Sequence, residues 1–294
     1  MDTAGLPAMK TINDVFSKVI VINLDRRPDR YRAVQAQLDL LGIRATRFAA
    51  FDGKDRRILD EWNEYAAAPL VAPRDDDPPA SNSRQFYLED KSDQARVAFV
   101  EQRDGKKAIA TAGAWGLLLS MTEVIEQAVI EGWQSLLILE DDALFHKDTT
   151  ALFDHVLGQL PADWAILQLG AMQTHWEPSW ITWHSKDLYK CNGSSIAAHA
   201  VGLLSEVFPA LLEATRKRDL PFDIGALHVV KRRYRERSFT CFPNLVIQDA
   251  TDSEIGMSEI FFREARQETN IYRWQISHYG LDAIKANMGR DGAL

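Results

Sequence analysis

The sequence is poor in the features that mark several specialised classes of protein. Its 294 residues include two cysteines, Cys191 and Cys241, which excludes a framework of several disulfides. So few cysteines favour a reducing compartment, and we expect a cytoplasmic protein; one bridge between the two stays open. The apolar run at residues 19–22 is far too short for a membrane span or a signal peptide. With 16 glycines and 11 prolines, the chain is neither collagen-like nor a linker.

The sequence also lacks several common functional patterns. It has 34 Lys and Arg against 42 Asp and Glu, and this net charge of −8 argues against nucleic acid as a partner. The Gly-x-Ser-x-Gly elbow, the phosphate-binding P-loop and the Gly-x-Gly-x-x-Gly dinucleotide fingerprint are all missing. A content of 46% hydrophobic and 26% charged residues is ordinary for a folded protein. The length allows one large domain or two small ones.

Strand-like and helix-like segments alternate along the chain. The apolar segments predict strands at residues 18–24, 46–48, 135–139, 164–169, 196–204, 238–242 and 245–247. Helical spacing of apolar residues predicts helices at 28–41, 108–130, 149–160 and 206–215. This alternation predicts an α/β fold with a mostly parallel central sheet.

Two regions depart from this alternation. Residues 69–105 lack any hydrophobic period, so we predict a long, mobile insertion there. The insertion is either a lid or substrate loop or an ordinary surface excursion. Residues 258–286 are amphipathic and predict a helical tail, which could pack on the core, mediate a dimer or touch a membrane surface.

Three acidic residues follow directly after the apolar residues 136–139. These are Glu140, Asp141 and Asp142, at the carboxyl end of a predicted buried strand. Ligands bind at that edge in open α/β sheets. Adjacent carboxylates repel one another unless a cation neutralises them, and Mg²⁺ or Mn²⁺ bridging a diphosphate is a natural partner. On a strand, Glu140 and Asp142 would share one side. The alternative is a solvated turn or a helix cap formed by Asp142.

A second polar segment follows the first predicted strand. Asn23 can hydrogen-bond a base or a ribose, and the guanidinium groups of Arg26 and Arg27 suit phosphate. Arg30 and Arg32 are better explained as surface charges of the following helix. A local ion pair between Asp25 and Arg26 is an alternative to a ligand site.

These segments together resemble glycosyltransferase family 25, which includes lipopolysaccharide galactosyltransferases and collagen β-galactosyltransferases. The resemblance rests on residues 21–30, 48–53 and 137–143, with weaker similarity at 220–223 and at 243–255. It covers roughly residues 18–255. We therefore predict a glycosyltransferase domain over 1–257, with the insertion near 69–105, and a helical tail over 258–294 that packs on it.

The resemblance implies a GT-A-type, Rossmann-like nucleotide-sugar fold and a manganese-dependent enzyme of lipopolysaccharide biosynthesis. The donor would be UDP-galactose or UDP-glucose, and a hexose would pass with inversion to a glycan or protein acceptor. Mn²⁺, or Mg²⁺, would bind Glu140 and Asp142. The donor would contact Asn23, Arg26, Arg27 and Asp141. An inverting displacement needs a carboxylate base, and Asp223 is the candidate, with a turn or helix cap as the alternative. We expect action in the cytoplasm, with contact at the inner membrane left open.

The chain also departs from the family pattern. Ala114 and Trp115 stand where the family usually shows Ser-His, and Gly202 stands where an aromatic residue is common. These departures motivate one alternative, a nucleotide-sugar-binding protein with impaired catalysis. A metal-dependent phosphoesterase would also fit the acids, but it predicts further clusters of His or Asp, which the sequence does not show.

Overall fold

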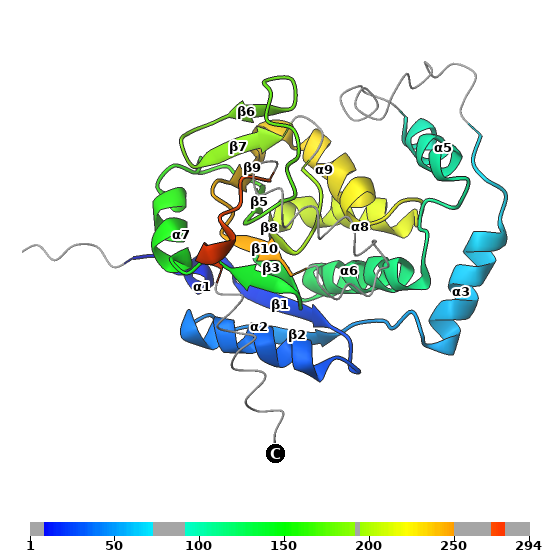
Figure 1. Cartoon of the computed structure of the whole chain (residues 1–294), viewed down its shortest axis with the longest axis horizontal. Helices are drawn as coiled ribbons and strands as arrows, with labels where there is room; N and C mark the ends of the chain where they lie inside the picture. Colours follow the sequence, from blue (N-terminus) through cyan, green and yellow to red (C-terminus); the bar gives the residue numbers. More distant parts are fainter. Residues whose placement is uncertain (1–8, 73–91, 192–194, 250–271, 280–294) are drawn as a thin grey trace, which may run out of the picture.

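The computed structural model describes residues 9–72, 92–191, 195–249 and 272–279, and its centre is an eight-stranded sheet (Figure 1). The strand order is β2-β1-β3-β8-β5-β9-β7-β6. The strands are β1 (Lys18–Asn23), β2 (Thr46–Ala49), β3 (Ser135–Glu140), β5 (Ile166–Gln168), β6 (Ile181–Trp183), β7 (Leu188–Cys191), β8 (Ala200–Leu204) and β9 (Ser238–Cys241).

The sheet is mixed, so the prediction of an α/β fold is confirmed but that of a mostly parallel sheet is wrong. Strand β1 pairs in parallel with β2 and β3, and β5 pairs in parallel with β9. Strand β8 lies antiparallel between β3 and β5, and the β6–β7 hairpin is antiparallel to β9 and within itself. Parallel neighbours need a crossover, usually a helix. Strands β5 and β8 are antiparallel, so no crossover helix joins them, and the chain between them forms the β6–β7 hairpin. The sequence analysis did not predict this hairpin.

Helices cover both faces of the sheet. One face carries α6 (Ala112–Ile130), α8 (Phe208–Arg216) and α9 (His228–Arg233), with α3 (Arg56–Ala67) packed against α6 to the side of the sheet (Figure 1). The other face carries α1 (Ile12–Val15), α2 (Pro28–Leu40) and α7 (Thr149–Leu157). The chain also forms three short helical turns: η1 (Ser205–Val207), the π-helical turn η2 (Asp223–Leu227) and η3 (Arg235–Arg237).

Strand β1 shows why its sequence gives a central strand. Ile20 and Ile22 pack with α6 on one face, whereas Val19 and Val21 pack with α2 on the other, and all four are buried. Side chains alternate between the faces of a strand, so an uninterrupted apolar run indicates a sheet covered on both sides.

A small antiparallel ribbon extends the core beyond the end of β3. Strand β10 (Val246–Gln248) pairs with β4 (Ala143–Phe145), so the predicted strand at residues 245–247 belongs to this ribbon and not to the main sheet. Tyr272, Trp274 and Tyr279 of the tail, which also holds the short turn η5 (Ile276–His278), are buried against the ribbon. Residues 258–271 and 280–294 of the expected helical tail lie outside the described residues. The division into a domain and a tail stays a prediction.

The expected insertion contains a helix, so the prediction that residues 69–105 lack regular structure is wrong over part of its range. Residues 73–91 lie outside the described part of the chain, but α5 (Asp93–Asp104) is a regular helix whose N-cap, Ser92, accepts a hydrogen bond from the backbone of Ala95. Arg96 and Glu101 are buried in it alongside apolar residues. Charged residues on the buried face hide the helical period from a reading based on hydrophobicity.

Two further expectations concern cysteines and membranes. Cys191 and Cys241 are both free thiols, so no bridge joins them. Among the helices in the described ranges, none is long and apolar enough to cross a membrane.

Candidate active site

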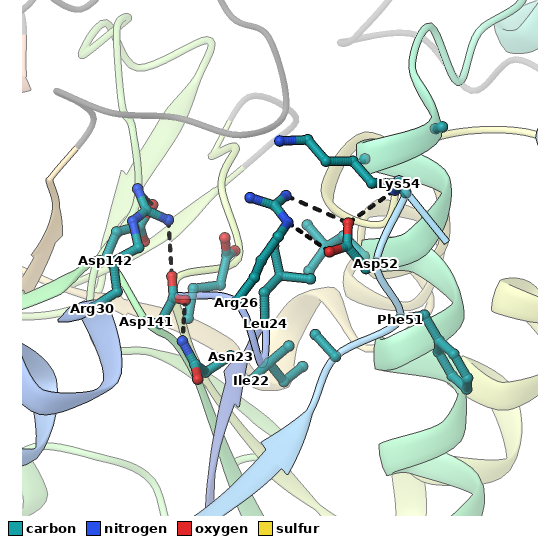
Figure 2. A pocket seen from close by; sticks show the side chains of 16 residues that line it. Ile22, Asn23, Leu24, Arg26, Arg30, Phe51, Asp52, Lys54, Asp141 and Asp142 are labelled. Atoms are coloured by element: carbon teal, nitrogen blue, oxygen red, sulfur yellow. Dashed lines mark hydrogen bonds and ion pairs between the residues drawn. The ribbon is translucent and has the colours of Figure 1, made fainter. Parts of the chain in front are cut away.

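A pocket of about 270 Å³ opens where β1 and β3 end (Figure 2). Acidic, basic and apolar side chains line the pocket, together with Ala112 and Gly113 at the start of α6. The lining residues are Ile22, Asn23, Leu24, Arg26, Arg30, Ala50, Phe51, Asp52, Gly53, Lys54, Ala112, Gly113, Leu117, Glu140, Asp141 and Asp142. Five of the seven predicted site residues are among them.

The parallel pairing of β1 and β3 brings the two polar segments together. Ile22 lies opposite Glu140 in the register, so the residues that follow each strand meet at one edge. The Asn23 side chain is buried and donates a hydrogen bond of 2.7 Å from Nδ2 to Oδ2 of Asp141. It also accepts one of 2.8 Å from Nε of Arg47. Asn23 therefore fixes Asp141 from the neighbouring strand.

The three acids lie in an environment that penalises their charged forms. Burial raises the pKa of Glu140 well above its ordinary value, and the negative charges of Asp142, Asp223 and Asp141 raise it further. Burial likewise raises the pKa of Asp142 to about 6, against the opposing charge of Arg30. The pKa of Asp141 is also raised by burial, although Arg30 and Asn23 lower it. An additional cation would relieve this repulsion.

Asp142 is held by β10 yet keeps one unsatisfied oxygen. Gln248 donates a hydrogen bond of 3.0 Å from Nε2 to Oδ2 of Asp142, and the backbone N–H of Asp249 donates to its carbonyl oxygen at 2.7 Å. Oδ1 of Asp142 is buried and has no hydrogen-bond partner. Buried carboxylate oxygens are normally paired, so this one indicates a missing ligand. Gln248 was not predicted as a site residue, and only its place in the family-like segment 243–255 pointed to it.

The protein side chains alone do not form a complete metal site. Within the described ranges, no group of three or more His, Cys, Asp or Glu side chains converges closely enough to hold an ion. Glu140 and Asp142 nevertheless supply hard oxygen ligands, one of them unpaired. Mg²⁺ and Mn²⁺ are commonly bound by one or two carboxylates together with substrate phosphates. The residues fit an ion whose remaining ligands come from a phosphate-containing substrate.

Arg30 lies in the pocket, and its interpretation as a surface charge is wrong. Its side chain is 14% exposed, and it forms an ion pair of 2.9 Å from Nη1 to Oδ1 of Asp141 and a longer contact of 3.9 Å from Nη2 to Oδ2 of Asp142. The available signal was its place in the first turn of α2, which begins at Pro28 directly after the β1 edge. The first turn of a helix that follows a strand faces the ligand edge of the sheet.

The opposite wall of the pocket is formed by the loop after β2. Arg26 forms an ion pair with Asp52, with Nε 2.5 Å from Oδ2, and the backbone N–H of Lys54 donates to Oδ1 of Asp52 at 2.9 Å (Figure 2). The loop touches the start of α6 so closely that a Cβ atom on Gly53 would lie 2.5 Å from the carbonyl carbon of Ala112. Glycine is therefore required there. Asp52 and Lys54 were not predicted as site residues.

Arg27 and Asp223 do not line the pocket. The Arg27 guanidinium forms an ion pair with Asp29, with Nη2 2.8 Å from Oδ2. Asp223, at the start of η2, accepts a hydrogen bond of 2.9 Å at Oδ2 from the backbone of Ala197. It is still close enough for its charge to raise the pKa of Glu140. The roles assigned to both residues stay predictions.

The departures from the family pattern also lie outside the pocket lining. Trp115 is buried in the core, where its ring lies tilted against that of Tyr65 with 4.8 Å between the ring centroids. Ala114 is partly buried and packs against the same core. Gly202 lies in the middle of β8, where a Cβ atom would collide with the ring of Phe16. All three positions are explained by packing.

Comparison with known proteins gives one family. The sequence model of glycosyltransferase family 25, described as an LPS biosynthesis protein family, matches residues 16–198. The match spans β1, the loop after β2 and the acids that follow β3, and it ends before Asp223 and Gln248. Among curated proteins, none is similar enough to this chain to count as a match.

Proposed function

Because the chain belongs to glycosyltransferase family 25, we propose that it transfers a galactose or glucose residue from a UDP-sugar to a glycan of lipopolysaccharide, with a divalent cation at Glu140 and Asp142. The observation that carries this proposal is the buried, unpartnered Oδ1 of Asp142 inside a pocket that concentrates three acids. A protein acceptor is the alternative. The pocket at the carboxyl edge of β1 and β3 supports a GT-A-type, Rossmann-like assignment.

The metal part of the proposal follows from the charge of the pocket. Glu140 and Asp142 are buried without enough positive charge to balance them, and each offers oxygen atoms of the kind that Mn²⁺ and Mg²⁺ prefer. A bound cation would stabilise the negative charge that develops on the diphosphate leaving group. Gln248 orients Asp142 for this task through its hydrogen bond to Oδ2.

The donor part of the proposal follows from the remaining lining. Arg26, Arg30 and Lys54 contribute positive charge near the acids, which suits a diphosphate bridged by a cation. Asn23 and Asp141 are linked to each other and line the same pocket, and we assign them to the ribose or the sugar. Arg27 contributes at a distance through its positive charge, which lowers the pKa of Asp141.

The acceptor must lose a proton as its hydroxyl attacks the sugar. In an inverting displacement a carboxylate takes this proton on the face opposite the leaving group. We assign this role to Asp223, which does not line the donor pocket but lies close enough to Glu140 for its charge to raise the pKa of that residue. Its hydrogen bond from Ala197 fixes the orientation of the carboxylate.

The two free thiols agree with action in the reducing cytoplasm.

A binding protein without catalysis is the weaker alternative. It was motivated by Ala114 and Trp115, and neither residue lines the pocket. The buried acids favour an enzyme, since a repulsive cluster with an unpaired oxygen costs stability unless a ligand uses it.

Donor hydrolysis tests the proposal without knowledge of the acceptor. Purified protein is incubated with UDP-galactose or UDP-glucose and Mn²⁺, and UDP release is measured. We expect slow release from one of the two sugars, abolished by EDTA and by Asp142→Asn. Absence of release from both, together with absence of UDP binding, would contradict the proposal. Binding without release, and without transfer to lipopolysaccharide acceptors, would favour the alternative.

A further inference from the structure

Arg30 is the nearest cation to the acid cluster and is placed to interact with two of its members. It extends from the first turn of α2, and its guanidinium contacts Asp141 at 2.9 Å and Asp142 at 3.9 Å. The two contacts differ in kind. The first is a hydrogen-bonded ion pair, whereas the second is too long for a hydrogen bond and is only electrostatic.

The charges around Arg30 are not balanced. Three carboxylates line this part of the pocket. Burial raises the pKa of Asp141 and of Asp142, and the positive charge of Arg30 is the largest influence that lowers both pKa values. A divalent cation at Glu140 and Asp142 would therefore enter a region in which Arg30 already supplies part of the neutralising charge. Two cations that serve the same carboxylate compete, because each repels the other.

We propose that Arg30 is an exchangeable counter-ion, which neutralises part of the charge of the acid cluster before the divalent cation binds and afterwards turns its Nη2 edge from Asp142 to the diphosphate of the donor. This inference rests on the proposed function. The ion pair with Asp141 anchors Nη1 throughout, and Asn23 holds Asp141 in place from the other side. A guanidinium presents several donors in a fixed fork, so it can keep one carboxylate while it binds phosphate with the other edge.

The proposal predicts effects of opposite sign on two ligands. In Arg30→Gln, we expect Mn²⁺ alone to bind at least about threefold more tightly, because a repelling charge is gone. At saturating Mn²⁺, we expect UDP to bind at least about tenfold more weakly, because a charge-assisted hydrogen bond to the diphosphate is lost. A purely structural role would weaken both. Free Mn²⁺ is measured by its electron paramagnetic resonance signal, and UDP binding by calorimetry.

The matched control is Arg32→Gln, on the same helix. Arg32 is exposed, does not line the pocket, and donates a hydrogen bond of 3.2 Å to the carbonyl oxygen of Pro28, so both affinities should stay unchanged. Should Arg30→Gln fail to fold, Arg30→Lys provides the test. The lysine keeps the charge but lacks the fork, so Mn²⁺ affinity should stay near that of the wild type while UDP affinity falls severalfold.

The outcomes separate this inference from the proposed function. Weaker or unchanged Mn²⁺ binding in Arg30→Gln, or unchanged UDP binding in both Arg30 variants, would overturn the role of Arg30 while leaving the metal site intact. A wild-type protein that binds no Mn²⁺, with or without UDP, would overturn both.

Discussion

The ion pair between Arg30 and Asp141 in the pocket and the ion pair between Lys107 and Glu101 are both largely shielded from solvent. Glu101 of α5 is fully buried and pairs with Lys107 at 2.8 Å. Its other oxygen accepts a hydrogen bond of 2.6 Å from the backbone of Val71, so one carboxylate meets one cation and two segments of backbone. Arg30 instead contacts two carboxylates of a cluster of three, and Oδ1 of Asp142 has no partner. The two ion pairs are thus similarly shielded from solvent but differ in their roles. A balanced, fully bonded pair joins segments of the fold, whereas we propose that the unbalanced cluster binds a ligand.

The largest expected effect tests the structural pair. In Glu101→Gln, Lys107 loses its buried counter-charge, and we expect the free energy of unfolding to fall by about 3–5 kcal/mol. Chemical denaturation measures this change, and Mn²⁺ affinity should be unaffected. The control Glu64→Gln, at an exposed position of α3, should stay within about 0.5 kcal/mol. A loss of Mn²⁺ binding in Glu101→Gln would contradict the distinction between a structural ion pair and a ligand site.

The second prediction concerns the pocket. Asp142→Asn removes a proposed metal ligand, and we expect UDP release from the donor sugar to fall by about 10²-fold or more. The metal-free variant should be at least as stable as the wild type, because a buried charge with an unpaired oxygen is gone. Thermal denaturation in EDTA checks the second point. Asp60→Asn, exposed on α3, is the control for both. A strongly destabilised Asp142→Asn would show that the acid cluster is structural.

Gln248 provides a third, smaller test. Replacing it with Leu removes the hydrogen bond to Oδ2 of Asp142 and keeps the approximate volume of the side chain. We expect Mn²⁺ affinity to fall by about tenfold, since partners that orient metal ligands typically contribute this much. Gln127→Leu, exposed on α6, should have no effect on Mn²⁺ binding. Equal affinities in the two variants would remove Gln248 from the site.

The smallest expected effect is a pH dependence of stability. The pKa of Asp142 is raised from 3.8 to about 6 in the folded state, mainly by burial. Its contribution to stability is therefore fully present below about pH 4 and is lost as the pH rises through about 6. Between pH 5 and 7.5, the metal-free wild type should lose about 1 kcal/mol relative to Asp142→Asn. The free energy of unfolding of both proteins is measured against pH in EDTA. The same pH dependence in the two proteins would contradict the prediction.

The sequence was most informative where strands are buried on both faces. The apolar runs before Asn23 and Glu140 predicted two central strands, and the edge rule for α/β sheets then brought their polar ends together. The same reasoning could not give the antiparallel placement of β8, because local pattern does not encode strand direction. It also missed α5, where the buried charges of Arg96 and Glu101 interrupt the apolar period.

Arg30 shows the limit of sequence reasoning at the site. An arginine on a helix is usually solvated, and the one local feature that sets Arg30 apart from Arg32 is its place in the first turn after the strand. Only the packing of α2 against β1 decides that one points into the pocket and the other into solvent. Asp52 and Lys54 line the pocket, and Gln248 bonds to Asp142, from segments far along the chain from the acids. Their contribution depends on tertiary contacts that a linear pattern does not contain.

Calorimetric titration of UDP into the wild-type protein, with Mn²⁺ and then with EDTA, tests the central claim most directly. If the acid cluster awaits a cation and a diphosphate together, UDP binds with Mn²⁺ and binding is lost or greatly weakened in EDTA. Equal binding in both conditions, or no binding in either, would contradict the claim. The acids after β3 would then need a structural explanation of the kind that fits Glu101 and Lys107.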